Sequence, residues 1–150
     1  MSHLVTPHGG QLTELLVAAD RARTLSEGAV DMPSLTLNDR QLNDLELLLN
    51  GGFSPLQGFL GQADYEAVVE RVRLADGTLW PMPIVLDVPE ATAEGLAVGG
   101  SIALREGEGV MLAVLHLEEV YRPDKAREAE QVYGTTDRAH PGVRYLFETA

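Results

Sequence analysis

The residues best suited to chemistry are few and lie far apart along the chain. The four histidines are His3, His8, His116 and His140, and no two of them have the i, i+4 spacing of a helical metal site. His116 could pair with Glu118 on one face of a strand, but a partly exposed strand histidine is the simpler interpretation. His8 and His140 lie in loops with Gly and Pro, where an imidazole can hold the loop through a backbone hydrogen bond. We favour that structural role over a catalytic one.

Nucleophile and phosphate-binding motifs are absent from the sequence. The chain has no cysteine, which excludes a thiolate nucleophile, a disulfide framework and a cysteine-based metal site. No serine has the Gly-x-Ser-x-Gly context of a hydrolase nucleophile. Neither Gly-x-x-x-x-Gly-Lys-Ser/Thr nor Gly-x-Gly-x-x-Gly occurs. The pair Gly51-Gly52 follows a predicted helix rather than a strand, so we interpret it as a helix stop and not as a phosphate loop.

The net charge of the chain limits the kinds of molecule that we expect it to bind. The chain has 11 basic and 23 acidic side chains and a formal net charge of −12. Nucleic-acid affinity comes mainly from neutralising phosphates, so we expect no nucleic-acid partner. The closely spaced carboxylates are interpreted as solvated surface, because nothing beside them indicates burial; they are Glu106 and Glu108, Glu118 and Glu119, and Glu128 and Glu130. No apolar run reaches the ~20 residues that cross a bilayer, and no secretory signal is visible, so we expect a cytoplasmic protein without membrane contact.

Helical patterns dominate the first half of the chain. Apolar residues at helical spacing predict a helix over Gln11 to Thr24, with a break at Gly28. Asn38 followed by Gln41 is a capping box that opens a second helix, which Asn50-Gly51-Gly52 ends. Ser54-Pro55 resembles another helix start and predicts a short turn of helix. A further helix is expected from about residue 63 to 73, with Tyr65, Val68, Val69 and Val72 on its buried face.

Strand patterns follow. Asp76-Gly77 predicts a tight turn before a strand over residues 78–88, which Pro81 and Pro83 would make irregular or place at a sheet edge. A short strand over 101–105 and a long one over 110–121 predict a hairpin. A helix is expected over 123–132, and residues 133–150 are predicted to be loop. The fold class is therefore α+β in one domain, residues 1–150, with a mixed or antiparallel, barrel-like sheet.

One stretch is far more specific than these patterns. The segment from Leu42 to Leu60, LNDLELLLNGGFSPLQGFL, closely resembles the N-terminal signature of ATP sulfurylase, also called sulfate adenylyltransferase. Further blocks resemble the same family and follow in its order, over about residues 4 to 147; they are PHGG at 7–10, RLADGTLWP at 73–81, VYRPDK at 120–125 and HPGV at 140–143. The order and spacing of these blocks make an accidental similarity very improbable.

The resemblance implies a fold and a role. The N-terminal domain of the family is a PUA-like β-barrel with accessory helices. The family is a nucleotidyltransferase of sulfate assimilation that converts MgATP and sulfate to adenosine 5′-phosphosulfate and pyrophosphate. In some relatives the same chain also carries an adenylylsulfate kinase domain.

The catalytic signature of the family, Gln-x-Arg-Asn-Pro-x-His-x-x-His, is absent from these 150 residues. We therefore assign no catalytic, substrate-binding or metal-binding residue and no cofactor to this chain, and we expect it to be inactive alone. The expected partner is the catalytic domain of the parent protein, and the chain is a candidate for homo-oligomer contacts. The candidate interdomain contact consists of two segments: His8, Gly9 and Gly10, and Asn50, Gly51, Gly52 and Phe53. An equally good interpretation is that each segment only closes its own loop or ends its own helix.

Two alternatives stay open at this point. PUA-like barrels elsewhere bind RNA, so the chain could be a stand-alone PUA-like module for RNA or for a protein partner, although its charge disfavours RNA. It could also be a paralogue that regulates or tethers a complete enzyme. If a partner domain normally covers apolar surface, the chain should expose an apolar patch or self-associate.

Overall fold

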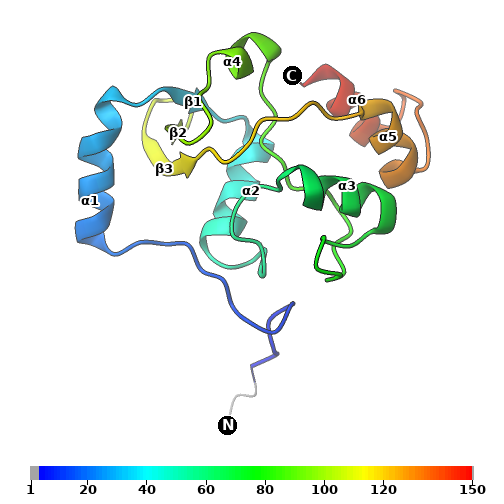
Figure 1. Ribbon diagram of the computed structural model, residues 1–150, viewed down its shortest axis with the longest axis horizontal. Coiled ribbons are helices and arrows are strands. Elements are labelled where there is room, and N and C mark those ends of the chain that lie inside the picture. Colours follow the sequence, from blue (N-terminus) through cyan, green and yellow to red (C-terminus); the bar gives the residue numbers. More distant parts are fainter. Residues whose placement is uncertain (1–3, 150) are drawn as a thin grey trace. The chain divides into compact units, whose positions relative to one another are not determined.

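The computed structural model describes residues 4–149, which form two compact units. The first unit holds the described residues up to Phe59 together with Gly99–Leu117, and the second holds Leu60–Val98 together with the described residues from Glu118 onward. Each unit is therefore made of two separate segments of the chain, which Figure 1 colours by residue number. No helix among the described residues has the length and apolar character needed to span a membrane.

The first unit is built on a small mixed sheet. Strand β1 (Ser34–Thr36) runs parallel to β2 (Ser101–Arg105), and β2 is antiparallel to β3 (Met111–His116). The order is β1-β2-β3. The middle strand is the core of the unit, because Ile102, Ala103 and Leu104 are at most 2% exposed. The α+β class is therefore confirmed, and the sheet in the described residues is open rather than a closed barrel.

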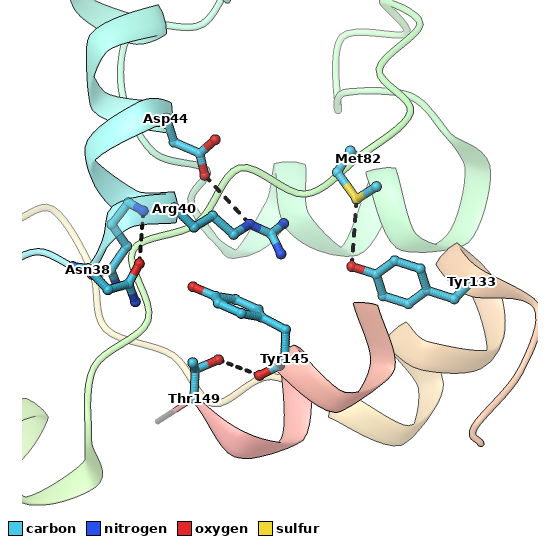
Figure 2. A network of polar contacts seen from close by, with 8 residues as sticks. Asn38, Arg40, Asp44, Met82, Tyr133, Tyr145 and Thr149 are labelled. Atoms are coloured by element: carbon cyan, nitrogen blue, oxygen red, sulfur yellow. Dashed lines mark hydrogen bonds and ion pairs between the residues drawn. The ribbon is translucent and has the colours of Figure 1, made fainter. Parts of the chain in front are cut away.

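Helices of the first unit lie on either side of β1 in the sequence. Helix α1 (Ala19–Gly28) leads into the short 3-10 helix η1 (Ala29–Asp31), and α2 (Asp39–Leu49) follows β1. The capping box predicted for α2 is confirmed: the Gln41 amide donates to Asn38 Oδ1 and the Asn38 amide donates to Gln41 Oε1, both at 3.0 Å. Figure 2 shows Asn38 at this helix end and Arg40, in the first turn, directed toward Asp44 one turn further along.

The second unit is mainly helical. It contains α3 (Gln62–Arg71), the short α4 (Glu90–Glu94), α5 (Lys125–Tyr133) and α6 (Pro141–Glu148). Tyr65, Val68 and Val69 of α3 are buried as predicted. Val72 is not on the buried face: it ends the helix in the left-handed conformation and is 44% exposed. Asp76 forms the predicted turn, and the bond that its carboxylate accepts from the Thr78 amide lowers the pKa of this carboxyl.

The chain differs from the sequence predictions where long-range contacts outweigh local pattern. The helix predicted over Gln11 to Thr24 is wrong before residue 19, because the amides of Leu15 and Leu16 donate to the Leu49 carbonyl instead of to local carbonyls. The strand predicted over 78–88 is absent apart from one bridge between Arg73 and Leu79. Residues 51–55 form turns rather than a new helical start.

The second half of the chain has further differences. The long strand expected over 110–121 is limited to β3. The loop expected over residues 133–150 contains α6, which begins with Pro at its first position. His140 caps this helix, because its Nδ1 accepts a hydrogen bond from the Gly142 amide at 3.2 Å. β1 and α4 were not predicted.

Candidate functional site: the corner surface

The turn at residues 7–10 lies against Pro55, in the segment that follows helix α2. The Gly10 amide donates to the Pro7 carbonyl at 2.9 Å and closes the turn. Gly9 has φ +75°, and a Cβ at this position would come within 2.8 Å of the Pro55 ring. The turn and the residues after α2 are therefore in direct contact, although more than forty positions separate them in the sequence.

A second close contact forms where α2 ends. Asn50 closes the helix, and its side chain accepts from the Gly52 amide at 2.8 Å. Gly51 is buried with φ +82°, and a Cβ there would stand 2.8 Å from Leu12 Cδ1. Gly51 therefore serves both the left-handed turn and the close approach of Leu12.

Ser54 joins the two segments through its hydroxyl. It is 5% exposed, donates to the Gly51 carbonyl at 2.7 Å and accepts from the Thr13 amide at 2.9 Å. The Leu15 amide adds a backbone bond to Leu49 at 2.9 Å. Because these bonds run between segments, residues 7–16 are fixed along the end of α2.

The candidate interdomain residues are thus brought together by the fold. We call them, together with Pro7 and Leu12, the corner surface: Pro7, His8, Gly9, Gly10, Leu12, Asn50, Gly51, Gly52 and Phe53. Leu12 is 57% exposed, and Leu47, which lies against Gly52, is 38% exposed. The corner surface contains no Asp, Glu, Lys or Arg, although the chain as a whole carries a net charge of −12. An uncharged surface with exposed leucine is suited to protein contact rather than to phosphate binding.

Sequence reasoning missed a buried polar cluster in the second unit. The Tyr65 hydroxyl donates to Glu128 Oε2 at 2.6 Å, and Glu128 is 6% exposed. The reading of Glu128 as a solvated surface carboxylate is therefore wrong. The ring of Tyr121 lies 5.5 Å from that of Tyr65, and its hydroxyl donates to the Leu60 carbonyl at 2.9 Å.

The same cluster perturbs both tyrosines. Burial, followed by the hydrogen bond and charge of Glu128, raises the pKa of the Tyr65 phenol well above its usual range. Burial, followed by the charge of Glu119, also raises the pKa of Tyr121. Glu119 is held in turn by the Gln62 amide, which donates to it at 2.7 Å at the start of α3. These contacts tie α3 to α5 and to the chain before it, so the cluster has a structural explanation.

The histidines do not converge. The ring of His116 faces Ser101 across β2 and β3, with Nδ1 3.1 Å from the hydroxyl, and not Glu118. His140 caps α6 and lies beside the Tyr133 ring, which in turn points toward Met82 in Figure 2. His8 is exposed on the corner surface, and His3 lies outside the described residues. Among residues 4–149 no three His, Asp or Glu side chains are grouped as metal ligands would be.

Comparison with known proteins places the chain in a family. A family model described as a PUA-like domain matches residues 5–150. The chain therefore belongs to the PUA-like domain family, as the resemblance in its sequence implied.

The curated relatives are sulfate adenylyltransferases. This chain is 52% identical to the sulfate adenylyltransferase of Gibberella zeae, and the match covers 97% of this chain. It is 51% identical to the sulfate adenylyltransferase of Chaetomium globosum, again over 97% of this chain. It spans only about a quarter of these relatives, 26% of each. Among solved structures, it is similar to a hexameric APS kinase from Thiobacillus denitrificans, with a TM-score of 0.71 and 38% identity over 81% of this chain and 24% of that one.

Proposed function

We propose that this chain is the N-terminal domain of a sulfate adenylyltransferase and that its task there is structural. The observation that carries this proposal is the match over nearly the whole chain to relatives that are about four times as long. The domain would support a catalytic part that takes MgATP and sulfate to adenosine 5′-phosphosulfate and pyrophosphate. The cationic and imidazole groups for that reaction would come from the catalytic part, because the family signature that carries them is absent here.

The corner surface is the proposed contact with the catalytic part. Two distant segments build it, its backbone is fixed by hydrogen bonds, and it presents an exposed leucine without any charged side chain. A fixed uncharged surface loses little side-chain entropy on docking, which favours a stable contact between domains. We further propose that the assembled protein is a homo-oligomer, because a structural relative of this chain is hexameric.

A domain exchange tests the proposal. The matching segment of the Gibberella zeae sulfate adenylyltransferase is replaced by this chain, and sulfate-dependent pyrophosphate release is measured. We expect the chimera to keep activity within roughly tenfold of the parent, a difference of about 1.4 kcal/mol. A folded chimera without sulfate-dependent turnover would contradict the proposed role.

A matched pair of variants locates the contact. Leu12→Asn lies in the corner surface and Val110→Asn in the turn between β2 and β3, and the two side chains are 57% and 58% exposed. We expect Leu12→Asn to weaken domain docking by about 1–2 kcal/mol, measured as a lower melting temperature of the chimera, and Val110→Asn to have little effect. Unfolding of the 150-residue chain with each variant corrects for any effect on its own stability. Equal effects of the two variants in the chimera would reject the corner surface as the contact.

A further inference from the structure

The end of α2 carries a pair of residues with a chemistry of its own. Asn50-Gly51 is the only Asn-Gly pair in the sequence, and Asn50 is exposed to water. The backbone nitrogen that follows an asparagine can attack its side-chain amide, and glycine hinders this attack least because it has no Cβ. The other two asparagines, Asn38 and Asn43, are each followed by aspartate. Asn50 therefore has the chemical setting that favours this reaction most.

The reaction exchanges the side-chain nitrogen of Asn50 for oxygen. The Gly51 nitrogen, after losing its proton to hydroxide, bonds to Asn50 Cγ; the bond from Cγ to Nδ2 then breaks, and ammonia leaves after taking up a proton. The product is a succinimide ring that joins the side chain to the backbone. Water opens this ring at either carbonyl and gives aspartate or isoaspartate. Both products carry a carboxylate at neutral pH, whereas asparagine is neutral.

The folded conformation of the pair is not the one in which this ring closes. Asn50 has ψ 2°, which turns the Gly51 nitrogen toward the Asn50 nitrogen and away from its Cβ. The ring can form only after the bond between Cα and C of Asn50 has rotated. The side chain is held as well, because its Oδ1 accepts from the Gly52 amide at 2.8 Å. The turn must therefore open before the pair reacts.

Contacts within the corner surface resist that rotation. Gly51 is buried, and a Cβ added to it would stand 2.8 Å from Leu12 Cδ1. Its carbonyl accepts from the Ser54 hydroxyl at 2.7 Å and from the Ser54 amide at 3.1 Å. The same hydroxyl accepts from the Thr13 amide at 2.9 Å. Rotation at Asn50 moves the Gly51 peptide away from these partners, and local openings of this kind occur without global unfolding.

We propose that Asn50 is a site of spontaneous deamidation whose rate is set by local opening of the corner surface. Water is the co-reactant. The reaction introduces a carboxylate into a surface that otherwise holds no charged side chain, and isoaspartate adds an extra backbone carbon where α2 ends. This inference goes beyond the proposed function, because it concerns the chemistry of the 150-residue chain itself.

Peptide mapping by mass spectrometry measures the conversion of each asparagine in the 150-residue chain during incubation in mildly alkaline buffer. We expect Asn50 to convert at least about tenfold faster than Asn38 or Asn43, and at least about tenfold slower than the same residue in chain unfolded by urea. Ser54→Ala removes the hydroxyl that joins the two segments. It should accelerate the conversion of Asn50 in the folded chain by about three- to tenfold.

Leu104→Val is the matched control for Ser54→Ala. It destabilises the buried middle strand of the same unit and leaves the contacts of the corner surface in place, so the conversion of Asn50 should stay unchanged. Urea unfolding of both variants measures how far each lowers the global stability. Leu12→Ala, which removes the side chain that packs on Gly51, repeats the test if Ser54→Ala does not fold.

Two kinds of result would overturn the inference. Conversion of Asn50 no faster than that of Asn38 and Asn43 would reject it as the site. A folded-state rate equal to the rate in urea, or equal acceleration by Ser54→Ala and Leu104→Val, would reject control by the corner surface. None of these measurements involves catalytic activity or domain docking, so each of these results would leave the proposed function standing.

Discussion

Single residues determine how the two segments of the corner surface meet. Gly51 combines a left-handed backbone with a close neighbour, Leu12, whose Cδ1 would stand 2.8 Å from an added Cβ and would have to shift. Gly58 lies only seven positions further along the chain, and a Cβ added there would meet nothing within 4 Å. The two glycines therefore form a natural comparison.

We expect Gly51→Ala to lower the free energy of unfolding by about 2–4 kcal/mol, from backbone strain and the clash with Leu12. Gly58→Ala should change it by less than about 0.5 kcal/mol. Urea unfolding followed by circular dichroism measures both. If the two variants proved equally stable, neither the left-handed backbone nor the close approach of Leu12 would constrain Gly51 as described.

The buried tyrosines make stability depend on alkaline pH. The pKa of Tyr65 is raised in the folded chain from its ordinary value of 10.0, so the folded state keeps the phenol proton after the unfolded state has lost it. The contribution of Tyr65 is fully present below about pH 10 and decreases as the pH rises further. We expect the free energy of unfolding to fall above that pH by up to ~1.4 kcal/mol per pH unit from Tyr65 alone. A series of urea titrations from neutral to alkaline pH measures this slope.

Tyr65→Phe separates the hydrogen bond from the titration. The variant should be about 1–3 kcal/mol less stable at neutral pH, because buried Glu128 loses a donor, and its alkaline slope should be smaller. Tyr133→Phe is the control, since the Tyr133 hydroxyl donates to the Met82 sulfur over 4.0 Å, and sulfur is a weak acceptor. A slope that persists unchanged in Tyr65→Phe would show that other groups cause it.

At the scale of elements, α2 is the helix whose ends are most fully specified by local sequence. Its capping box uses both the side chain and the amide of Asn38. We expect Asn38→Ala to cost about 1 kcal/mol of stability, measured by thermal unfolding. Asn43→Ala, on the exposed face of the same helix, should be neutral or slightly stabilising because alanine favours helix. Loss of stability in Asn43→Ala as large as in Asn38→Ala would contradict the capping account.

Local sequence predicted the elements whose determinants are local. The α2 cap and stop, the Asp76 turn and the hairpin of β2 and β3 follow from residues within a few positions of one another. The segment before α1 has equally clear helical spacing but adopts an extended path, because Thr13 and Leu15 bond to residues beyond position 48. Its apolar stripe describes contacts with α2 and exposed surface rather than a helix face.

The sequence indicated which residues to consider for the candidate interdomain contact, but not how they are arranged in space. The glycine motifs indicated two segments of interest, but only the fold shows that Pro55 and Leu12 bring them together. The burial of Glu128 had no signal in its neighbours, because its partner Tyr65 lies on another helix 63 positions away. Such long-range pairs depend on tertiary packing, which spacing along the chain does not record.

At the scale of the molecule, we propose that one activity is divided between two parts of a polypeptide. Under the proposed function, the chain supplies a folded surface, and the chemistry belongs to the part of the parent protein that carries the family signature. Incubating the purified 150-residue chain with MgATP and sulfate, and following pyrophosphate release, tests this most directly. The account predicts no sulfate-dependent release above the buffer background. Sulfate-dependent turnover by this chain alone would contradict it.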